Sequence, residues 1–304
     1  MQEIFLPIKQ DLQGFNPFFG SWVCRGDLTV MVDVGPANTA GRLLDLTKAS
    51  GIERLDYILL THIHIDHGGA LASVLARYPE AKVICHEKGI PHLVDPNKLY
   101  EGSLKVLGNL ARTYGKPTPL AEERLVPHTK CRVDGLRIIE TPGHAIHHLS
   151  FTYGKRLYAG EAAGNYFIVE GQDYLRPATP PRFFLNVFMK SVDRLLALED
   201  QPIRYAHVES AESAHGLLRL FRDQLLLWEA IIGEAVNRGE NKPDIIRDCV
   251  DRLLKEDPRL RAFSSMDDHT QKRERTFMTN SVNGFVGFFE EKLKKARLLN
   301  HEKE

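Results

Sequence analysis

Four side chains of metal-ligand type follow directly after a short apolar segment, and this arrangement constrains the fold more than any other feature of the chain. The segment His62-Ile63-His64-Ile65-Asp66-His67 comes straight after the apolar residues 57–60 and is followed by Gly68-Gly69. A short apolar run of this kind is typical of a buried strand. The cluster therefore falls where a strand ends and the chain turns. A polar surface cluster at a strand end is the alternative interpretation.

The spacing inside the cluster matches what a metal site needs. Imidazole and carboxylate groups are the usual nitrogen and oxygen ligands of zinc and similar ions. Residues i and i+2 of an extended segment point to the same side, so His62 and His64 can converge on one ion. Asp66 and His67 follow at the turn and can face a second ion. We expect one or two zinc ions, with iron or manganese as the alternatives.

Strand-like and helix-like segments alternate through the first two thirds of the chain, which predicts a layered α/β domain. The expected strands are 28–33, 57–60, 81–86, 137–140, 149–153, 156–159 and 203–207. The expected helices are 39–50, 70–78, 104–114, 182–198, 210–238, 244–254 and 276–298. We therefore expect the α/β domain over residues 1–208 and a helical extension over residues 209–304 that packs on it or caps it.

The composition argues against several classes of protein. Of the 304 residues, 43% are hydrophobic, which supports a packed core. Lys plus Arg and Asp plus Glu number 40 each, so we expect a small-molecule substrate and neither nucleic acid nor membrane as a partner. The N-terminus does not resemble a secretory signal and no segment approaches about 18 uninterrupted apolar residues, so a cytoplasmic protein is expected. The four cysteines form no CxxC and are expected to be free thiols.

Five segments resemble the metallo-β-lactamase-fold metallohydrolases, in that family's order, and point to its glyoxalase II-like and lactonase-like branch. Thr61 to His67 looks like the HxHxDH signature, and Thr141-Pro142-Gly143-His144 is similar to the next motif. Leu157 to Ala162 falls where the family has an apolar pair, a small residue, Gly and a bridging Asp. His207 follows an expected strand, as the family's last metal histidine does. Asp33 matches the strand-end aspartate that supports the site.

The resemblance implies a four-layer αβ/βα sandwich, the metallo-β-lactamase fold, here with a C-terminal helical extension. The metal ligands that it implies are His62, His64 and His144 for one ion, Asp66, His67 and His207 for the other, and Glu161 between the two. Asp66 would also act in catalysis, by orienting the nucleophile or passing a proton. His147 and His148 are read as residues of the pocket or of the ligands' surroundings, with plain packing as the alternative.

The chain departs from the family at Glu161, where aspartate is usual. Glutamate is longer by one methylene group, and metal–oxygen distances tolerate only ~0.2 Å of error. The carboxylate either bridges two ions after a local shift, binds one ion and leaves the second site weak, or is not a ligand. The number of ions therefore stays open at the level of the sequence.

The resemblance implies a metal-dependent hydrolase in which metal-bound hydroxide attacks the carbonyl of a thioester, an ester or a lactone. The alternatives are a mono-iron sulfur dioxygenase, a nuclease of the same fold, and a catalytically weak metal-containing binding or signalling protein. Tyr166 and Tyr174 are candidate donors to an oxyanion or leaving group, or they pack in loops. The Phe-rich segments 15–19 and 183–188 line an apolar pocket or pack in the core. The helical extension could roof the site or form a homodimer contact.

Overall fold

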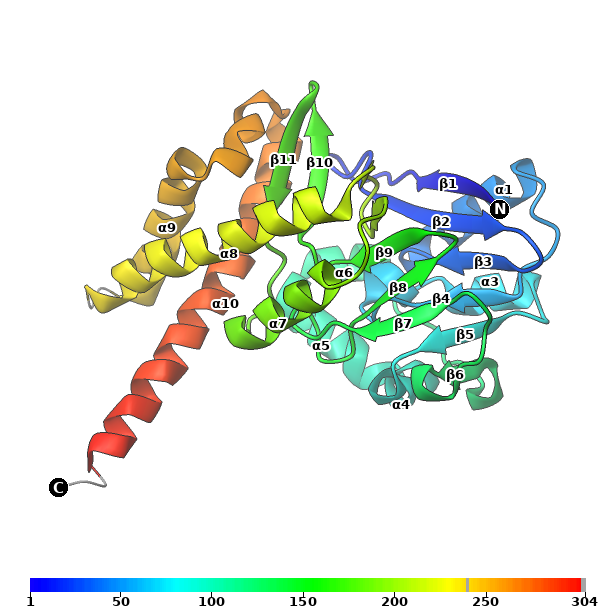
Figure 1. Cartoon of the computed structure of the whole chain (residues 1–304), viewed down its shortest axis with the longest axis horizontal. Coiled ribbons are helices and arrows are strands. Elements are labelled where there is room, and N and C mark those ends of the chain that lie inside the picture. Colours follow the sequence, from blue (N-terminus) through cyan, green and yellow to red (C-terminus); the bar gives the residue numbers. More distant parts are fainter. Residues whose placement is uncertain (239–240, 302–304) are drawn as a thin grey trace. The chain divides into compact units, whose positions relative to one another are not determined.

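The computed structural model describes residues 1–238 and 241–301 (Figure 1). Its internal contacts divide the chain into two units. The first unit consists of Met1–Thr141, His147–Gly160 and Gln201–Glu212. The second unit consists of Pro142–Ile146, Glu161–Asp200 and Ser213–Glu304. Both large β-sheets belong to the first unit, and the four longest helices belong to the second.

The larger sheet has six strands in the order β1-β2-β3-β4-β5-β6, antiparallel from β1 to β3 and parallel from β3 to β6. Its strands are β1 (Gln2–Ile8), β2 (Phe19–Arg25), β3 (Thr29–Val32), β4 (Tyr57–Leu59), β5 (Lys82–Cys85) and β6 (Leu125–Pro127). Strands β3, β4 and β5 confirm three predictions from the apolar pattern. Strands β1, β2 and β6 were not predicted from the sequence. β1 is an edge strand with a mostly half-exposed pattern, and β2 is buried along almost its whole length, so neither shows clear alternation.

Helical crossovers join the parallel strands, as this strand order requires. The helix α1 (Ala40–Ala49) lies between β3 and β4, and α2 (Ile65–Gly68) and α3 (Leu71–Arg77) lie between β4 and β5. The predicted helices 39–50 and 70–78 are thereby confirmed. Because the strands run parallel, their carboxyl ends share one edge of the sheet, and the residues that follow each strand are brought together there.

The second sheet has five strands in the order β13-β12-β9-β8-β7. Its strands are β7 (Arg137–Glu140), β8 (Leu149–Tyr153), β9 (Arg156–Gly160), β12 (Ile203–Tyr205) and β13 (Ser210–Ala211). Four of them match predicted strands. β12 runs parallel to β9, and the other neighbours are antiparallel.

A hydrophobic core fills the space between the two sheets of the first unit. Both sheets contribute alternate side chains to it, as expected for strands with one face inward. The buried members are Trp22, Cys24, Val30, Val32, Leu59, Ile84, Leu149, Phe151, Tyr153 and Tyr158. The indole of Trp22 also donates a hydrogen bond to the carbonyl of Tyr205 (3.0 Å), which ties the first sheet to the second.

The predicted single helix over residues 104–114 is wrong. The structure has two helices, α5 (Asn97–Leu107) and α6 (Asn109–Tyr114), with Gly108 between them at φ 56°. Glycine reaches this left-handed region without steric cost, so the backbone changes direction there instead of continuing the helix. The apolar period runs across both helices, and periodicity alone did not reveal the break.

The second unit is mainly helical and contains one hairpin. Its hairpin strands are β10 (Asn165–Val169) and β11 (Gln172–Arg176), and its long helices are α7 (Leu185–Leu196), α8 (Ala214–Asn237), α9 (Lys242–Glu256) and α10 (Asp268–His301). The four helices confirm the helical predictions for the last third of the chain. The hairpin was not predicted.

Buried polar contacts hold the elements of the second unit together. The guanidinium of Arg176, on β11, forms a buried ion pair with Glu274, on α10. Asp257, which precedes residues 258–265, accepts hydrogen bonds from the indole of Trp228 (2.8 Å) and the amide of Gln224 (2.7 Å), both on α8. Buried charges are tolerated when they are paired or fully hydrogen-bonded, as both are here.

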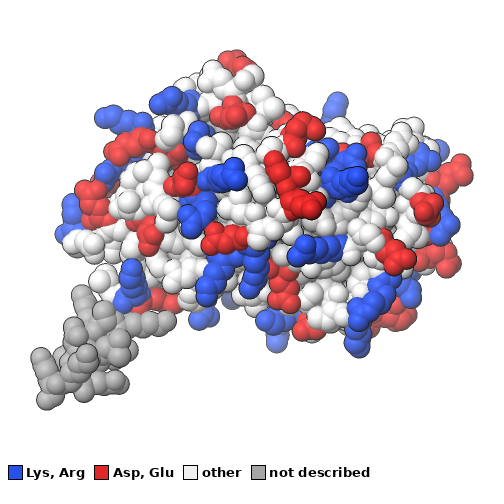
Figure 2. Space-filling view, viewed as in Figure 1, with Lys and Arg blue, Asp and Glu red and all other residues white. Residues whose placement is uncertain are grey.

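Positive and negative side chains alternate over the face of the molecule that Figure 2 shows, in line with the equal numbers of acidic and basic residues. Within residues 1–238 and 241–301, none of the helices combines the length and the apolar character that a membrane span needs.

Candidate metal centre

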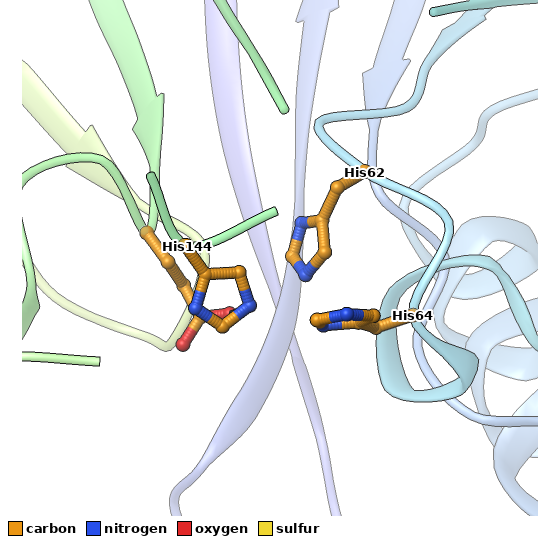
Figure 3. Close-up of side chains that lie close together, drawn as sticks. His62, His64 and His144 are labelled. Carbon is orange, nitrogen blue, oxygen red and sulfur yellow. The ribbon is translucent and has the colours of Figure 1, made fainter. Parts of the chain in front are cut away.

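The predicted cluster folds as a short extended segment followed by a helical turn. Strand β4 ends at Leu59, and α2 begins at Ile65, with the carbonyl of His64 accepting bonds from the backbone N–H groups of His67 (3.0 Å) and Gly68 (2.9 Å). The rings of His62 and His64 meet edge to face with centroids 4.5 Å apart, and His67 lies 4.1 Å from His62. Figure 3 shows the rings of His62 and His64 extending away from the chain that carries them. The cluster is thus concentrated at the strand end, as its spacing predicts.

Asp33 supports this segment from the neighbouring strand end. Its backbone has φ 53°, and its side chain is buried just beyond β3. Oδ1 accepts a hydrogen bond from the backbone N–H of Thr61 (2.8 Å), and Oδ2 accepts from Oγ1 of Thr61 (2.8 Å). Oδ2 also accepts from Nδ1 of His67 (3.0 Å). A buried carboxylate needs such partners, and the partners of Asp33 belong to the segment that contains the predicted ligands.

His207 reaches the same region from the end of β12. Its side chain is buried, and Nδ1 donates a hydrogen bond to the carbonyl of Phe18 (3.1 Å). The ring stacks on the phenyl ring of Phe18, with centroids 4.3 Å apart. Asp66, His67 and His207 each offer a ligand atom, and these atoms all lie within 4.8 Å of one another. The structure therefore brings together, within the first unit, the three residues that the resemblance assigns to one ion.

The second unit carries His144 and Glu161, which also meet. His144 is drawn in Figure 3 and lies in the loop Pro142–Ile146, which Ser191 of α7 anchors by donating a hydrogen bond to the carbonyl of Pro142 (2.6 Å). Nδ1 of His144 donates to the carbonyl of Ala178 (2.9 Å). Nε2 of the same ring lies 2.9 Å from Oε2 of Glu161.

One feature is common to four of the predicted ligand histidines: Nδ1 meets a group that can only accept. The Nδ1 partners are Asp33 for His67, the carbonyl of Phe18 for His207, the carbonyl of Ala178 for His144 and Oγ1 of Thr61 for His62. The Thr61 hydroxyl gives its proton to Asp33, so toward His62 it accepts. In the neutral ring this places the proton on Nδ1 and the lone pair on Nε2. Metal-binding histidines are held in the same way by a partner of the second nitrogen.

The sequence profile of the Metallo-beta-lactamase superfamily matches residues 21–207, more than half of the chain. The chain belongs to this superfamily. A metallo-beta-lactamase fold-containing protein of Sulfurisphaera tokodaii is 34% identical over 198 residues, covering 61% of this chain and 70% of that protein. A hydroxyacylglutathione hydrolase of Cupriavidus taiwanensis is 28% identical over 228 residues, covering 72% of this chain and 74% of that protein.

Solved structures agree with this membership. The crystal structure of an archaeal metallo-β-lactamase superfamily protein from Sulfolobus tokodaii superimposes with a TM-score of 0.62 at 30% sequence identity, covering 74% of this chain and 86% of that one. The metallo-β-lactamase fold predicted from the sequence, with a helical C-terminal region, is thereby confirmed. Most members of the superfamily are metal-dependent hydrolases.

The donor groups fit the divalent transition metals that metallo-β-lactamase-fold proteins hold. Nitrogen lone pairs on buried imidazoles and carboxylate oxygens are ligands that such ions accept. Nε2 of His67 lies 3.6 Å from Oδ2 of Asp66, and Nε2 of His144 faces Glu161. In each pair a ring lone pair is turned toward a carboxylate oxygen, an arrangement that a cation between the two acceptors stabilises.

His148 belongs to the surroundings of the ligands. It is fully buried, and Nδ1 donates to Oγ1 of Thr141 (2.8 Å), which in turn contacts Oγ of Ser150 (2.9 Å). The ring packs against Gly160, which has φ 60°: a Cβ there would lie 2.5 Å from Nε2 of His148 and 3.1 Å from Cβ of Thr61. His147 is half-buried and lies beside the histidine cluster of the first unit, with its ring centroid 5.9 Å from that of His64.

Of the two tyrosines considered as donors, one is hydrogen-bonded elsewhere and the other is buried. The Tyr166 hydroxyl donates to Oδ1 of Asp173 (2.6 Å) across the β10–β11 hairpin. Tyr174 is completely buried, and this burial raises the pKa of its phenol well above the ordinary value. We therefore assign neither tyrosine to the chemistry. Of the Phe-rich segments, Phe15, Phe18, Phe19, Phe183 and Phe188 are buried, and Phe184 is exposed.

A second histidine cluster in the first unit was not predicted from the sequence. His86 follows β5, His128 follows β6 and Glu140 ends β7, so only the fold brings them together. Their ligand-type atoms lie within 4.8 Å, the two rings stack at 4.4 Å, and Nε2 of His128 lies 3.1 Å from Oε1 of Glu140.

The hydrogen bonds of this second cluster differ from those of the metal centre. Nδ1 of His86 accepts from the backbone N–H of Lys88 (3.1 Å), and Nδ1 of His128 accepts from that of Glu87 (3.3 Å). Nε2 of each ring then carries a proton and faces Glu140. Burial first, and His128 second, lower the pKa of His86. In this cluster the two Nε2 atoms face the carboxylate of Glu140, so the rings do not present the Nε2 lone pairs that the predicted ligand histidines present.

Proposed function

We propose that the chain is a hydrolase that uses one or two zinc-type ions to cleave a thioester, an ester or a lactone. The ions would be held by His62, His64 and His144 on one side and by Asp66, His67 and His207 on the other, with Glu161 between them. The observation that carries the proposal is the shared orientation of four of the five predicted ligand rings, whose Nδ1 atoms each meet an acceptor. Side chains oriented in advance in this way lose little entropy when an ion binds.

A divalent ion at this place would acidify a water molecule and polarise a carbonyl group. The chain itself contributes the proton acceptor. Asp66 keeps 19% of its side chain exposed, whereas the side chains of His67 and Asp33 are exposed by only 2% and 3%. Of the two carboxylates beside the histidine cluster, Asp33 and Asp66, Asp66 is therefore the one that an attacking water can reach, and it is suited to orient that water and take its proton.

The family and one relative support the proposed substrate class. A carbonyl next to a sulfur or oxygen leaving group is the electrophile that this chemistry attacks most readily. The similarity to a hydroxyacylglutathione hydrolase makes a hydroxyacyl-glutathione the first substrate to test. We expect the substrate to be a small molecule, because the chain has as many acidic as basic side chains.

The test combines metal analysis with a substrate panel. The full chain, purified without chelator, is analysed for metal and assayed on a hydroxyacyl-glutathione, an aryl ester and a lactone. We expect His64→Ala to lower kcat/KM by about 100-fold or more. His269→Ala is the matched control, because His269 is an exposed histidine on α10 outside every ligand group of the described residues, and it should act like wild type.

Other outcomes separate the alternatives. Equal rates for wild type and His64→Ala on all three substrates would sink the hydrolase proposal and favour a metal-containing binding protein. Iron in the purified chain, with oxygen consumption on a glutathione persulfide, would point to a sulfur dioxygenase. Cleavage of a phosphodiester alone would point to a nuclease.

A further inference from the structure

Thr61, the residue before the first ligand histidine, makes contacts that link the two predicted ion positions. Its side chain is fully buried. Oγ1 donates to Oδ2 of Asp33 (2.8 Å) and lies 3.0 Å from Nδ1 of His62. The same Oδ2 atom accepts from Nδ1 of His67 (3.0 Å). One carboxylate oxygen is thus connected to His67 directly and to His62 through a single hydroxyl group.

The direction of each hydrogen bond is fixed by chemistry. A carboxylate that meets a hydroxyl and a ring nitrogen accepts from both, so the Thr61 hydroxyl donates its one proton to Asp33. Toward His62 the hydroxyl can only accept, which requires the proton of that ring on Nδ1. His67 likewise has its proton on Nδ1. Both rings therefore present the Nε2 lone pair, the form in which imidazole binds a metal.

The Thr61 hydroxyl cannot easily turn away from this position. The backbone N–H of Thr61 donates to Oδ1 of Asp33 (2.8 Å), and its carbonyl accepts from the N–H of Leu149 (2.7 Å) on the second sheet. Gly160 lies so close that a Cβ there would be 3.1 Å from Cβ of Thr61. A β-branched side chain has few rotamers to begin with, and here the neighbours on three strands select one.

We propose that Thr61 is a positioning residue, through which the single carboxylate of Asp33 orients one histidine of each ion site. This inference rests on the proposed metal ligation by His62 and His67. It predicts an asymmetry that packing alone does not: loss of the Thr61 hydroxyl weakens the ion held by His62 and spares the ion held by His67, whereas loss of the Asp33 charge weakens both.

The experiment is a zinc titration of the full chain against a chromophoric chelator, which gives a dissociation constant for each ion. His64→Ala and His207→Ala identify which constant belongs to which ion. Thr61→Val removes the hydroxyl and keeps the shape, Thr61→Ser restores the hydroxyl without the methyl group, and Asp33→Asn removes the charge. Thr47→Val is the control, because Thr47 is another buried threonine whose hydroxyl donates to a backbone carbonyl, that of Leu44 (2.8 Å).

We expect Thr61→Val to raise the dissociation constant of the His62 ion about 10- to 100-fold, the usual effect of losing a partner of a ligand histidine. The other ion should change by less than about threefold, and Thr61→Ser and Thr47→Val should bind both ions like wild type. The visible spectrum of the cobalt-substituted protein should change at one ion only.

The outcomes distinguish this inference from the proposed function. If wild type binds zinc and Thr61→Val binds it equally well, or loses both ions to the same extent, the role of Thr61 is refuted while metal binding stands. If wild type binds a single ion that His64→Ala abolishes, Thr61→Val must weaken it, and an unchanged constant overturns the inference. If the single ion is the one that His207→Ala abolishes, Thr61→Val must leave it unchanged, and a weakened constant overturns the inference. If wild type binds no zinc, the proposed function fails and this inference fails with it.

Discussion

Nε2 of His144 lies 2.9 Å from Oε2 of Glu161, and Nδ1 of the same ring donates to the carbonyl of Ala178. The neutral ring therefore turns a lone pair toward a carboxylate oxygen. Two acceptors at this separation repel each other unless a proton or a cation lies between them. We read this contact, at the position where the chain departs from the usual family motif, as a pair of candidate metal ligands.

Substitution of Glu161 tests this interpretation. Glu161→Gln keeps the shape but replaces one oxygen with an N–H donor, which can satisfy Nε2 of His144 without an ion. We expect zinc binding to weaken by at least about tenfold, since loss of even an indirect partner costs this much. Glu161→Asp keeps the charge and should retain zinc. Wild-type affinity in Glu161→Gln, measured by chelator competition, would show that Glu161 is not a ligand.

The cluster of His86, His128 and Glu140 predicts how stability depends on pH. The folded-state pKa of His86 is lowered from 6.5, mainly by burial, and that of Glu140 is lowered from 4.5, mainly by the hydrogen bond from His128. Lowered values mean that the unfolded chain binds these protons more readily, so both groups stabilise the fold at higher pH and lose this effect on acidification. We expect Tm to fall as the pH drops below about 6.5, and further below about 4.5.

The variant His86→Asn separates this effect from the titration of other groups. Asparagine can still accept the N–H of Lys88 at this cap position but does not titrate. Thermal unfolding in chelator from pH 7.5 to 4 should show a smaller first decline for the variant than for wild type. Parallel curves for the two proteins would contradict the assignment to His86.

Asp257 lies in the connection that follows α9, and we expect its side chain to contribute substantially to the free energy of unfolding. Its carboxylate is buried and accepts from Trp228, Gln224 and the backbone N–H of Arg259 (2.9 Å). Asp257→Ala leaves these donors without their acceptor, and we expect the free energy of unfolding to fall by about 3 kcal/mol. Urea unfolding, followed by Trp228 fluorescence in a Trp22→Phe background, measures the change in the second unit.

Asp251→Ala is the matched control for that experiment. Asp251 pairs with Arg275 (2.6 Å), but its side chain is 58% exposed. A surface ion pair of this kind contributes little, so the change should stay within about 0.5 kcal/mol. Equal losses for the two variants would mean that burial of Asp257 has no special effect.

None of the four cysteines forms a disulfide, as predicted from the sequence, and their burial decides their reactivity. Cys24, Cys85 and Cys249 are buried, and burial raises the pKa of Cys85 to about 12. Cys131 is the partly exposed one. We expect a maleimide to label one thiol in the native chain and four in urea, counted by mass spectrometry. Cys131→Ser should abolish the native labelling, and labelling that persists would show that a core thiol becomes accessible.

The sequence revealed the parts of the fold and site that depend on local pattern. Strands β3, β4 and β5 are short apolar runs, and Asp33 and the cluster His62–His67 follow the first two of them, so the apolar pattern and the spacing were sufficient to predict them. The break at Gly108 was missed because the apolar period continues through it, and a glycine within such a period does not by itself predict a turn. The His86, His128 and Glu140 cluster was missed because three separate strand ends meet there, and no local pattern records that meeting.

The supports of the ligand histidines were also beyond local prediction. Two of them are the backbone carbonyls of Phe18 and Ala178. Because every residue has a backbone carbonyl, the residue type does not indicate this role. Thr61 lies beside His62 in the sequence, but the role of its hydroxyl depends on a hydrogen bond to Asp33, 28 positions earlier. Such contacts follow from the register between strands, which composition and periodicity leave undetermined.

The close packing of residue 160 against both His148 and Thr61 sets a condition on how this centre can vary in evolution. A lineage could exchange surface residues around the cluster freely, but any side chain larger than hydrogen at that position would collide with the neighbours that keep the rings in place. We therefore expect distant homologues with the same ligand arrangement to have glycine at position 160. The histidines alone are a weaker criterion, because they can be retained in a chain whose supporting contacts differ.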